Sequence, residues 1–255
     1  MKISIVTCTW NSEPYLAETI ASVLAQDYAS IEFVFVDGGS TDGTLERIAT
    51  LPRPVTVLHD VNGGISRAMN AGWRAATGDI VAYLHSDDYY LSPTVLSRVA
   101  RAFSQTTGWG FGRIVRDIEG KQIQENFVAP KYSRRRLLRG NFIPHPATFV
   151  RREWLRQVGG FNESLKYAMD YDLWLKLSQL GDPVVLNGPL AAFREHDRSL
   201  STRNKIAAME EDYFVRRQHV GGNPLIRLEN LARFYVRRNR MVQATRHKAP
   251  ASQIE

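Results

Sequence analysis

The sequence His85-Ser86-Asp87-Asp88 places a histidine, a hydroxyl and two adjacent carboxylates directly after a short apolar segment. That segment, residues 80–84, is predicted to be a buried strand. Adjacent carboxylates repel each other, so a positive group is expected beside them. A hard divalent cation that holds a diphosphate fits this role, because such ions bind one or two carboxylates together with phosphate oxygens. The alternative is a solvated turn that caps a helix beginning near Ser92.

Strand-like and helical segments alternate through the first hundred residues. The strands are predicted at 2–7, 31–36, 55–58 and 80–84, and the helices at 14–24, around 45–48 and at 65–76. This alternation predicts an α/β protein with a parallel, doubly wound sheet. Ligands of such sheets bind at the carboxyl ends of the strands. The polar residues at three strand ends are therefore expected to converge, namely Thr7, Thr9, Asp37, Asp87 and Asp88.

Composition excludes several classes of protein. The chain has 255 residues, of which 44% are hydrophobic and 23% charged, as in ordinary soluble proteins. The single cysteine, Cys8, excludes an internal disulfide and fits a reducing compartment. No apolar run is long enough to span a bilayer, so a cytoplasmic protein is predicted. Neither G-x-G-x-x-G after the first strand nor a G-x-x-x-x-G-K-[ST] segment is present, which argues against NAD enzymes and P-loop NTPases.

The formal net charge is +7, and arginines cluster at 134–139 and 233–240. Such clusters attract nucleic acid, anionic lipid or phosphorylated substrates. A nucleic-acid binder would interleave aromatic residues with the arginines on a recognisable motif, which is missing, so no nucleic-acid partner is predicted. Residues 224–240 combine an apolar stripe with arginines at the C-terminal end, which suits a helix on an anionic membrane surface. The alternative is a helix packed on its own domain with a solvated basic face.

Four ordered segments resemble successive motifs of family 2 glycosyltransferases. They are Ile5-Val6-Thr7-Cys8-Thr9-Trp10-Asn11, Ser22-Val23-Leu24-Ala25-Gln26, Val36-Asp37-Gly38-Gly39-Ser40-Thr41-Asp42-Gly43-Thr44 and Leu84-His85-Ser86-Asp87-Asp88. The resemblance covers residues 1 to about 200. It implies the GT-A fold, with a Rossmann-like, mostly parallel sheet, helices on both faces, a small added antiparallel element and C-terminal helices. It also implies an inverting enzyme that uses Mn²⁺ or Mg²⁺ to move a sugar from a nucleotide-diphosphate donor to an acceptor hydroxyl.

The resemblance also implies which residues contact the nucleotide-sugar donor. The family commonly has Asp-Asp where this chain has Asp37-Gly38, so the base could be uridine or guanosine. Where the family often has Arg-Asn, this chain has Met69-Asn70, and Arg67 is a candidate substitute for phosphate binding. The donor contacts implied by motif position are Thr7, Thr9, Glu13, Asp37, Asn62, Arg67, Ser86, Asp87 and Asp88.

Metal ligands are implied at two places. Asp87 matches the last Asp of the family's D-x-D signature, and His85 stands in place of the first, so its part in metal binding is open. His196 lies in a segment that resembles the family's Arg-x-His sequence and would approach the metal or the diphosphate. Arg194 or Arg198 would neutralise phosphate charge. A packed histidine is the alternative for His196.

The general base is implied at Asp170. In the family this place usually reads Glu-Asp, and Met169 replaces the Glu here. From the residues alone, Asp170 could equally be an acid in the first turn of a helix, where the helix dipole stabilises it. Asp172 is the second candidate, because one of two nearby acids often has its pKa raised by the other. His145, in a loop between two prolines, and Asp172 are candidate acceptor contacts; a surface or packed side chain is the alternative for His145.

The chain is divided by these patterns into three parts. The resemblance implies a GT-A domain at residues 1–200, with a nucleotide-binding half at 1–100 and an acceptor-binding half at 101–200. Residues 201–247 are predicted to form a C-terminal helical extension, and 248–255 a disordered tail.

The predicted function is sugar transfer in cell-surface polysaccharide or glycolipid assembly. The partners would be a UDP- or GDP-sugar and a glycan or lipid-linked acceptor. The protein would be cytoplasmic and peripheral at the inner face of the cell membrane. A nucleotide-sugar-binding module without catalysis is the alternative, which the departures at His85 and Met69 keep open.

Overall fold

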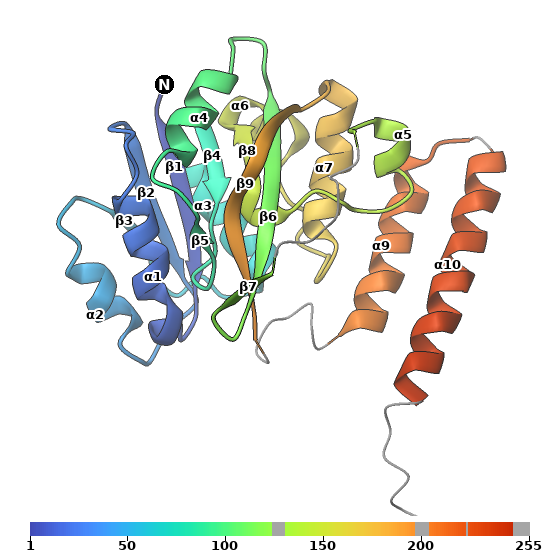
Figure 1. Ribbon diagram of the computed structural model, residues 1–255, viewed down its shortest axis with the longest axis horizontal. Helices are drawn as coiled ribbons and strands as arrows, with labels where there is room; N and C mark the ends of the chain where they lie inside the picture. The colour runs from blue at the N-terminus through green and yellow to red at the C-terminus, as the bar shows by residue number, and fades with distance from the viewer. Residues whose placement is uncertain (124–130, 197–203, 223, 247–255) are drawn as a thin grey trace, which may run out of the picture.

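One twisted sheet runs through the molecule, with helices on both of its faces (Figure 1). The computed structural model describes residues 1–123, 131–196, 204–222 and 224–246. Within them the sheet has nine strands in the order β3-β2-β1-β4-β8-β6-β9-β5, and β7 pairs with β6. The strands are β1 Ile3–Thr9, β2 Ile31–Asp37, β3 Thr56–Leu58, β4 Ile80–Tyr83, β5 Tyr89–Tyr90, β6 Trp109–Ile118, β7 Lys121–Ile123, β8 Thr148–Arg151 and β9 Val184–Glu195. The helices are α1 Glu13–Leu24, α2 Thr44–Ala49, α3 Ile65–Ala75, α4 Val95–Ala102, α5 Arg134–Leu137, α6 Arg152–Val158, α7 Met169–Leu180, α9 Lys205–His219 and α10 Pro224–Arg246, with a 3₁₀ turn at His145–Ala147.

The first four strands of the sheet are parallel, as the alternation of strands and helices predicts. β1 pairs with β2 so that Thr9 lies opposite Asp37, and its other edge pairs with β4. The carboxyl ends of these strands therefore meet at one edge of the sheet. β8 runs antiparallel to both β4 and β6, and a hairpin joins β6 to β7. The expected parallel α/β sheet is confirmed, and its antiparallel part begins at β8.

Both faces of the sheet are buried, which explains the almost wholly apolar strands. On one face, α1, α2 and α4 cover a core that includes Ile5 and Phe35. On the other, α3, α6 and α7 cover a core that includes Val6 and Val36. In this second core the ring of Trp109 from β6 stacks on that of Trp174 from α7, with centroids 6.0 Å apart. α7 is thereby anchored against the sheet.

The closing part of the sheet is formed by a single strand, although its sequence contains a glycine and a proline. β9 is one strand that continues past Gly188 and Pro189. Its pairing with β6 shifts register there, so that Phe111 faces Val185 and Arg113 faces Pro189. A bulge tolerates proline because the residue is out of the regular ladder. The continuous strand carries the chain from the sheet to His196.

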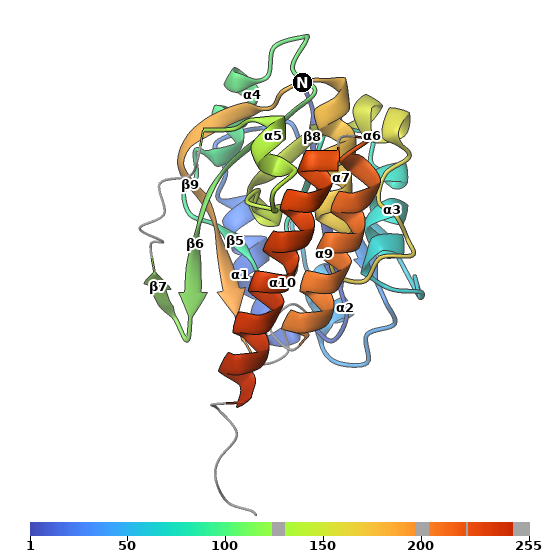
Figure 2. The same ribbon diagram turned by 90° about the vertical axis from the view of Figure 1, so that its right-hand side faces the viewer.

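The C-terminal helices form an outer layer (Figure 2). α9 packs on α7, and α10 packs on α9. Val215 of α9 is fully buried in the same core as α7, so α9 is part of the domain's packing. None of the helices in the described residues combines the length and apolarity needed to cross a membrane.

Candidate active site

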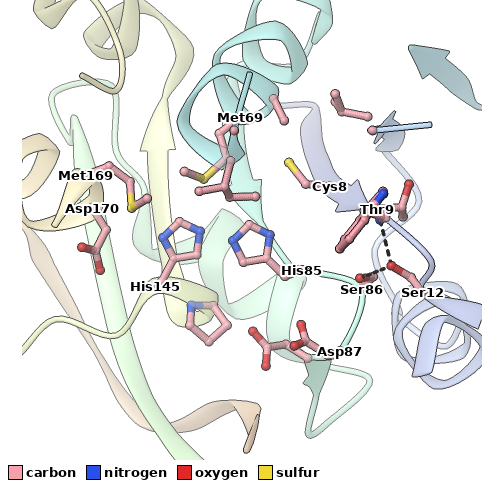
Figure 3. Close-up of a pocket in the computed structure, with 18 of the residues that line it drawn as sticks. Cys8, Thr9, Ser12, Met69, His85, Ser86, Asp87, His145, Met169 and Asp170 are labelled. Carbon is pink, nitrogen blue, oxygen red and sulfur yellow. Dashed lines mark hydrogen bonds between the residues drawn. The ribbon is translucent and has the colours of Figure 1, made fainter. Parts of the chain in front are cut away.

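A cavity of about 840 Å³ opens at the carboxyl ends of β1 and β4. Its walls come from the loops after β1, β2 and β4, the start of α3, the 3₁₀ turn and the start of α7. Figure 3 shows Thr9, Ser86 and Asp87 on one side of the cavity and Asp170 on the other, with His85 and His145 between them. The structure therefore brings the strand-end residues and the candidate base to one cavity.

The loops after β1 and β2 are held together by the carboxylate of Asp37. Its Oδ1 accepts hydrogen bonds from Thr9 Oγ1 at 2.8 Å and Ser40 Oγ at 2.6 Å, and its Oδ2 accepts from the N–H groups of Gly39 and Ser40. Burial would raise the pKa of Asp37, but these hydrogen bonds outweigh it and lower the pKa. An ionised Asp37 thus fixes the loop that lines the cavity at Val36 and Gly38.

The predicted donor residues divide into two groups. Thr9, Asn62, Ser86, Asp87 and Asp88 line the cavity. The other four contact protein groups behind it. Thr7 donates to the carbonyl of Leu84, Glu13 pairs with Arg47, Asp37 holds its own loop, and Arg67 lies against Gly63.

Several lining residues were not predicted as donor contacts, among them Trp10 and Tyr167. Trp10 is 71% exposed at the cavity, and Tyr167 lines it together with Asp170. An aromatic ring in the loop directly after β1 was the available signal for Trp10, since ligands of such sheets bind at the carboxyl ends of the strands.

The two carboxylates after β4 have different surroundings. Asp87 opens to the cavity, and its Oδ2 lies 3.0 Å from His196 Nε2. Burial would raise the pKa of Asp87, but the hydrogen bond from His196 and the nearby His85 outweigh it and lower the pKa. Asp88 is 1% exposed and accepts from the N–H of Arg194 at 3.1 Å. Burial and the charge of Asp87 raise the pKa of Asp88, so Asp87 carries the negative charge at this corner.

Arg194 is held away from the cavity. Its guanidinium pairs with Glu18 and with Asp117, and it lies over the rings of Tyr15 and Tyr89. It is not among the lining residues. Arg198, the other arginine considered for phosphate binding, lies outside the described residues.

A pair of stacked histidines stands between Asp87 and Asp170. The rings of His85 and His145 lie 4.7 Å apart and within 6° of parallel. Burial lowers the pKa of both, and for His145 the nearby His85 adds to this. His85 Nδ1 and His145 Nε2 have no hydrogen-bond partner among the described residues. Because buried polar atoms are normally paired, these two nitrogens mark where polar groups of a ligand would bind.

The carboxylate of Asp170 is suited to accept a proton. It lies in the first turn of α7, with Oδ1 accepting from the N–H of Tyr171 at 2.6 Å and Oδ2 from Asn141 Nδ2 at 3.3 Å. Burial, and then the charge of Asp212, raise the pKa of Asp170 to about 7. A base with a pKa near the working pH is the most effective proton acceptor. The neighbouring Met169 adds apolar surface at the cavity wall.

Asp172 faces away from the cavity. It is 2% exposed, and its two oxygens contact His219 Nε2 at 2.9 Å and Lys176 Nζ at 2.7 Å. Burial opposes ionisation, but these two partners lower the pKa of Asp172. The side chain links α7 to α9 and does not line the cavity. The prediction that Asp172 is an acceptor contact is therefore not supported by its position. His145, by contrast, does line the cavity.

Replacing Asp172 by asparagine is expected to destabilise the protein without removing a cavity group. The change leaves Lys176 and His219 without their shared anion, and breaking a buried pair costs about 3 kcal/mol. The measurement is the urea midpoint of unfolding, with Asp27→Asn at an exposed carboxylate as the matched control. A midpoint equal to that of the control would contradict the assigned link between α7 and α9.

The residues at the carboxyl end of β4 fit a divalent cation in part. Within the described residues, no group of three or more His, Cys, Asp or Glu side chains could hold a metal by itself. Asp87 Oδ2 and His196 Nε2 lie 3.0 Å apart, so one oxygen and one nitrogen could bind the same cation. Cations that bind nucleotides use few protein ligands and complete their shell with phosphate oxygens and water. The pair therefore fits a metal that arrives with a diphosphate.

Comparison with known proteins identifies the family. Residues 4–159 match the family described as Glycosyl transferase family 2. The chain therefore belongs to glycosyl transferase family 2 and carries a domain of that family.

Similar curated proteins include a chondroitin synthase of Escherichia coli (33% identical, covering 70% of this chain and 27% of that protein) and a hyaluronan synthase of Pasteurella multocida (33% identical, 84% and 22%). This chain thus spans about a quarter of the length of these relatives.

Solved structures with the same fold include S. aureus TarS 1-349 in complex with UDP-GlcNAc. Its TM-score is 0.70 at 22% identity, over 92% of this chain and 73% of that one. A mannosyltransferase of Pyrobaculum calidifontis in complex with GDP-Man and Mn²⁺ has a TM-score of 0.67 at 21% identity, over 91% and 69%. The expected family and fold are confirmed by these comparisons.

Proposed function

We propose that the protein transfers a sugar from a UDP- or GDP-sugar to an acceptor hydroxyl, with inversion at the anomeric carbon. The observation that carries the proposal is the cavity that holds both Asp87 and Asp170, one ionised carboxylate and one with a pKa raised to about 7. Family membership and the nucleotide-sugars bound to proteins of the same fold support it.

The residues divide the chemistry between them. The donor nucleotide would bind over Thr9 and the loop fixed by Asp37, with its diphosphate toward Ser86 and Asp87. Asp87 and His196 would hold Mn²⁺ or Mg²⁺, which as a Lewis acid would neutralise charge on the leaving diphosphate. Asp170 would take the proton of the acceptor hydroxyl as that oxygen attacks the anomeric carbon. Attack opposite the leaving group inverts the configuration and needs no covalent enzyme intermediate.

The neutral histidine pair would contribute to binding. Both histidines line the cavity, so their unpaired nitrogens would meet hydroxyl groups of the donor sugar or acceptor. A lining of Cys8, Met69 and Met169 would exclude water from the reacting atoms, which strengthens electrostatic interactions there.

A donor screen tests the activity. The protein is incubated with Mn²⁺ and a panel of UDP- and GDP-sugars, and nucleotide release is followed. We expect release with one donor well above the metal-free control. Binding of a donor without release under any acceptor would favour the alternative, a binding module without catalysis. No binding of any donor would overturn both.

We also propose that the acceptor is a glycan or a lipid-linked glycan in cell-surface polysaccharide assembly, handled at the cytoplasmic side of the membrane. The names of the relatives, which include synthases of two polysaccharides and an O-antigen biosynthesis protein of Myxococcus xanthus, support this class of product.

The outer face of α10 supports contact with an anionic membrane. Its apolar stripe points away from the domain, with Leu225, Leu228 and Tyr235 76%, 63% and 54% exposed. Asn230, on the opposite side, is 2% exposed against the domain. The stripe is bordered by exposed arginines that include Arg227 and Arg240. An apolar face with basic borders is the pattern of helices that lie in the interface of anionic lipids.

Vesicle binding tests this surface. The protein is expected to sediment with phosphatidylglycerol vesicles and far less with phosphatidylcholine vesicles. The double variant Leu225→Asp/Leu228→Asp should remain in the supernatant, because each charge would have to enter the interface. Leu24→Asp, at an exposed leucine on α1, is the matched control. Equal sedimentation of the double variant and the control would remove α10 as the anchor.

A further inference from the structure

A carboxylate of α9 reaches the segment that leads into the candidate base. Glu211 Oε2 accepts from the N–H groups of Tyr167 at 2.5 Å and Ala168 at 2.7 Å. The N–H of Lys166 donates to both oxygens of Glu211, at 3.0 and 3.1 Å. One side chain thus binds three consecutive backbone donors directly before Met169 and Asp170.

The local sequence offers no such support. The residue at the N-cap of α7 is Ala168, whose side chain has no atom that can accept a hydrogen bond. Helix N-termini leave backbone N–H groups unpaired and favour a negative charge nearby. Glu211 accepts from the N–H of Ala168 and places a carboxylate at this end of α7, from another helix more than forty residues further along the chain.

The segment that Glu211 holds belongs to the site. Lys166 and Tyr167 line the cavity together with Asp170, and Glu211 itself is absent from the lining. Any shift of residues 166–168 would move the first turn of α7 and the Asp170 carboxylate with it. A displacement of about 1 Å at a reacting group can cost roughly 100-fold in rate.

We propose that Glu211 is a positioning residue, which fixes the start of α7 and thereby sets the Asp170 carboxylate against the acceptor hydroxyl. This inference rests on the proposed function, in which Asp170 is the base. Through Glu211, α9 would have a direct part in the geometry of catalysis, although α9 lies beyond the family match at residues 4–159.

The test compares turnover of Glu211→Ala, Glu211→Gln and Glu210→Ala in the full chain. Glu211→Ala should lower kcat about 10- to 100-fold, with the KM for the donor changed less than twofold. Glu211→Gln keeps an oxygen that can accept from Tyr167 and Ala168, so it should recover most of the rate. Glu210, the exposed neighbour that pairs with Arg238, is the matched control and should behave as the unaltered chain. Should Glu211→Ala not fold, Glu211→Asp, whose carboxylate is one methylene too short, should lower kcat about tenfold.

A second comparison separates positioning from general loss of structure. In the Asp170→Asn background, Glu211→Ala should cause no further loss of residual transfer, because the group that it positions is already gone. A full additional loss, or an unchanged kcat in Glu211→Ala or Glu211→Asp, would overturn the inference. Failure of the proposed function would appear differently, as no turnover of the unaltered chain with any donor.

Discussion

Asp170→Asn is expected to lower sugar transfer by about 10²- to 10⁴-fold while leaving donor affinity unchanged, because general-base catalysis is lost and little else. Asparagine has the same shape as aspartate, and its oxygen can still accept from the N–H of Tyr171. The donor residues lie on the other side of the histidine pair, so they keep their positions (Figure 3). Single-turnover rates and calorimetric binding of the donor measure the two quantities separately.

The matched control is Asp172→Asn, the same substitution two residues along α7. Asp172 is paired with Lys176 and His219 outside the cavity, so its loss should reduce stability and leave kcat per folded molecule near its original value. Normal transfer by Asp170→Asn together with loss of transfer in Asp172→Asn would move the role of base to Asp172.

The pH dependence provides an independent check on Asp170. Its pKa is raised to about 7 by burial and by the charge of Asp212, so the carboxylate is protonated below that pH. Only the ionised form can accept a proton, so kcat should fall about tenfold per pH unit below 7 and reach a plateau above it. Removing the charge of Asp212 with Asp212→Asn should shift this midpoint to lower pH.

The parallel half of the fold could be predicted because its signals are local. Strand and helix periods alternate along the first hundred residues, and parallel pairing then forces the strand ends together. Thr9 and Asp37 end up hydrogen-bonded for this reason alone. The two-residue strand β5 is too short to give a period, so it could not be recognised.

The roles of individual site residues were less predictable because they depend on how elements pack. Asp170 and Asp172 are two positions apart on α7 and therefore point to different sides of the helix. Asp170 lines the cavity, whereas Asp172 pairs with His219 of α9, a contact between distant segments. The same holds for the stack of His85 on His145 and for Glu211, whose partners lie far away in the sequence.

Asp87→Asn is expected to lower kcat roughly 10³-fold, about 4 kcal/mol, because a Lewis acid that neutralises a leaving diphosphate contributes several kcal/mol. Asp87 is the ionised carboxylate at the end of β4, whereas the pKa of Asp88 is raised by burial and by Asp87. The amide keeps a contact with His196 but removes the negative charge that a divalent cation requires. Asp88 cannot substitute, since it is buried and holds the N–H of Arg194.

The measurement combines activity with direct metal binding. Mn²⁺ is titrated in the presence of the donor nucleotide, and binding is measured as the loss of the electron paramagnetic resonance signal of free Mn²⁺. Binding should be weaker in Asp87→Asn than in the control Asp27→Asn. Activity of the variant should need a higher Mn²⁺ concentration and should reach a lower plateau even at saturation.

Unchanged Mn²⁺ binding with unchanged kcat would exclude Asp87 as the metal ligand. Unchanged Mn²⁺ binding with a lowered kcat would instead place Asp87 against the diphosphate without the metal. Because Asp27 is exposed and is not part of the cavity lining, any general effect of losing one negative charge is cancelled in this comparison.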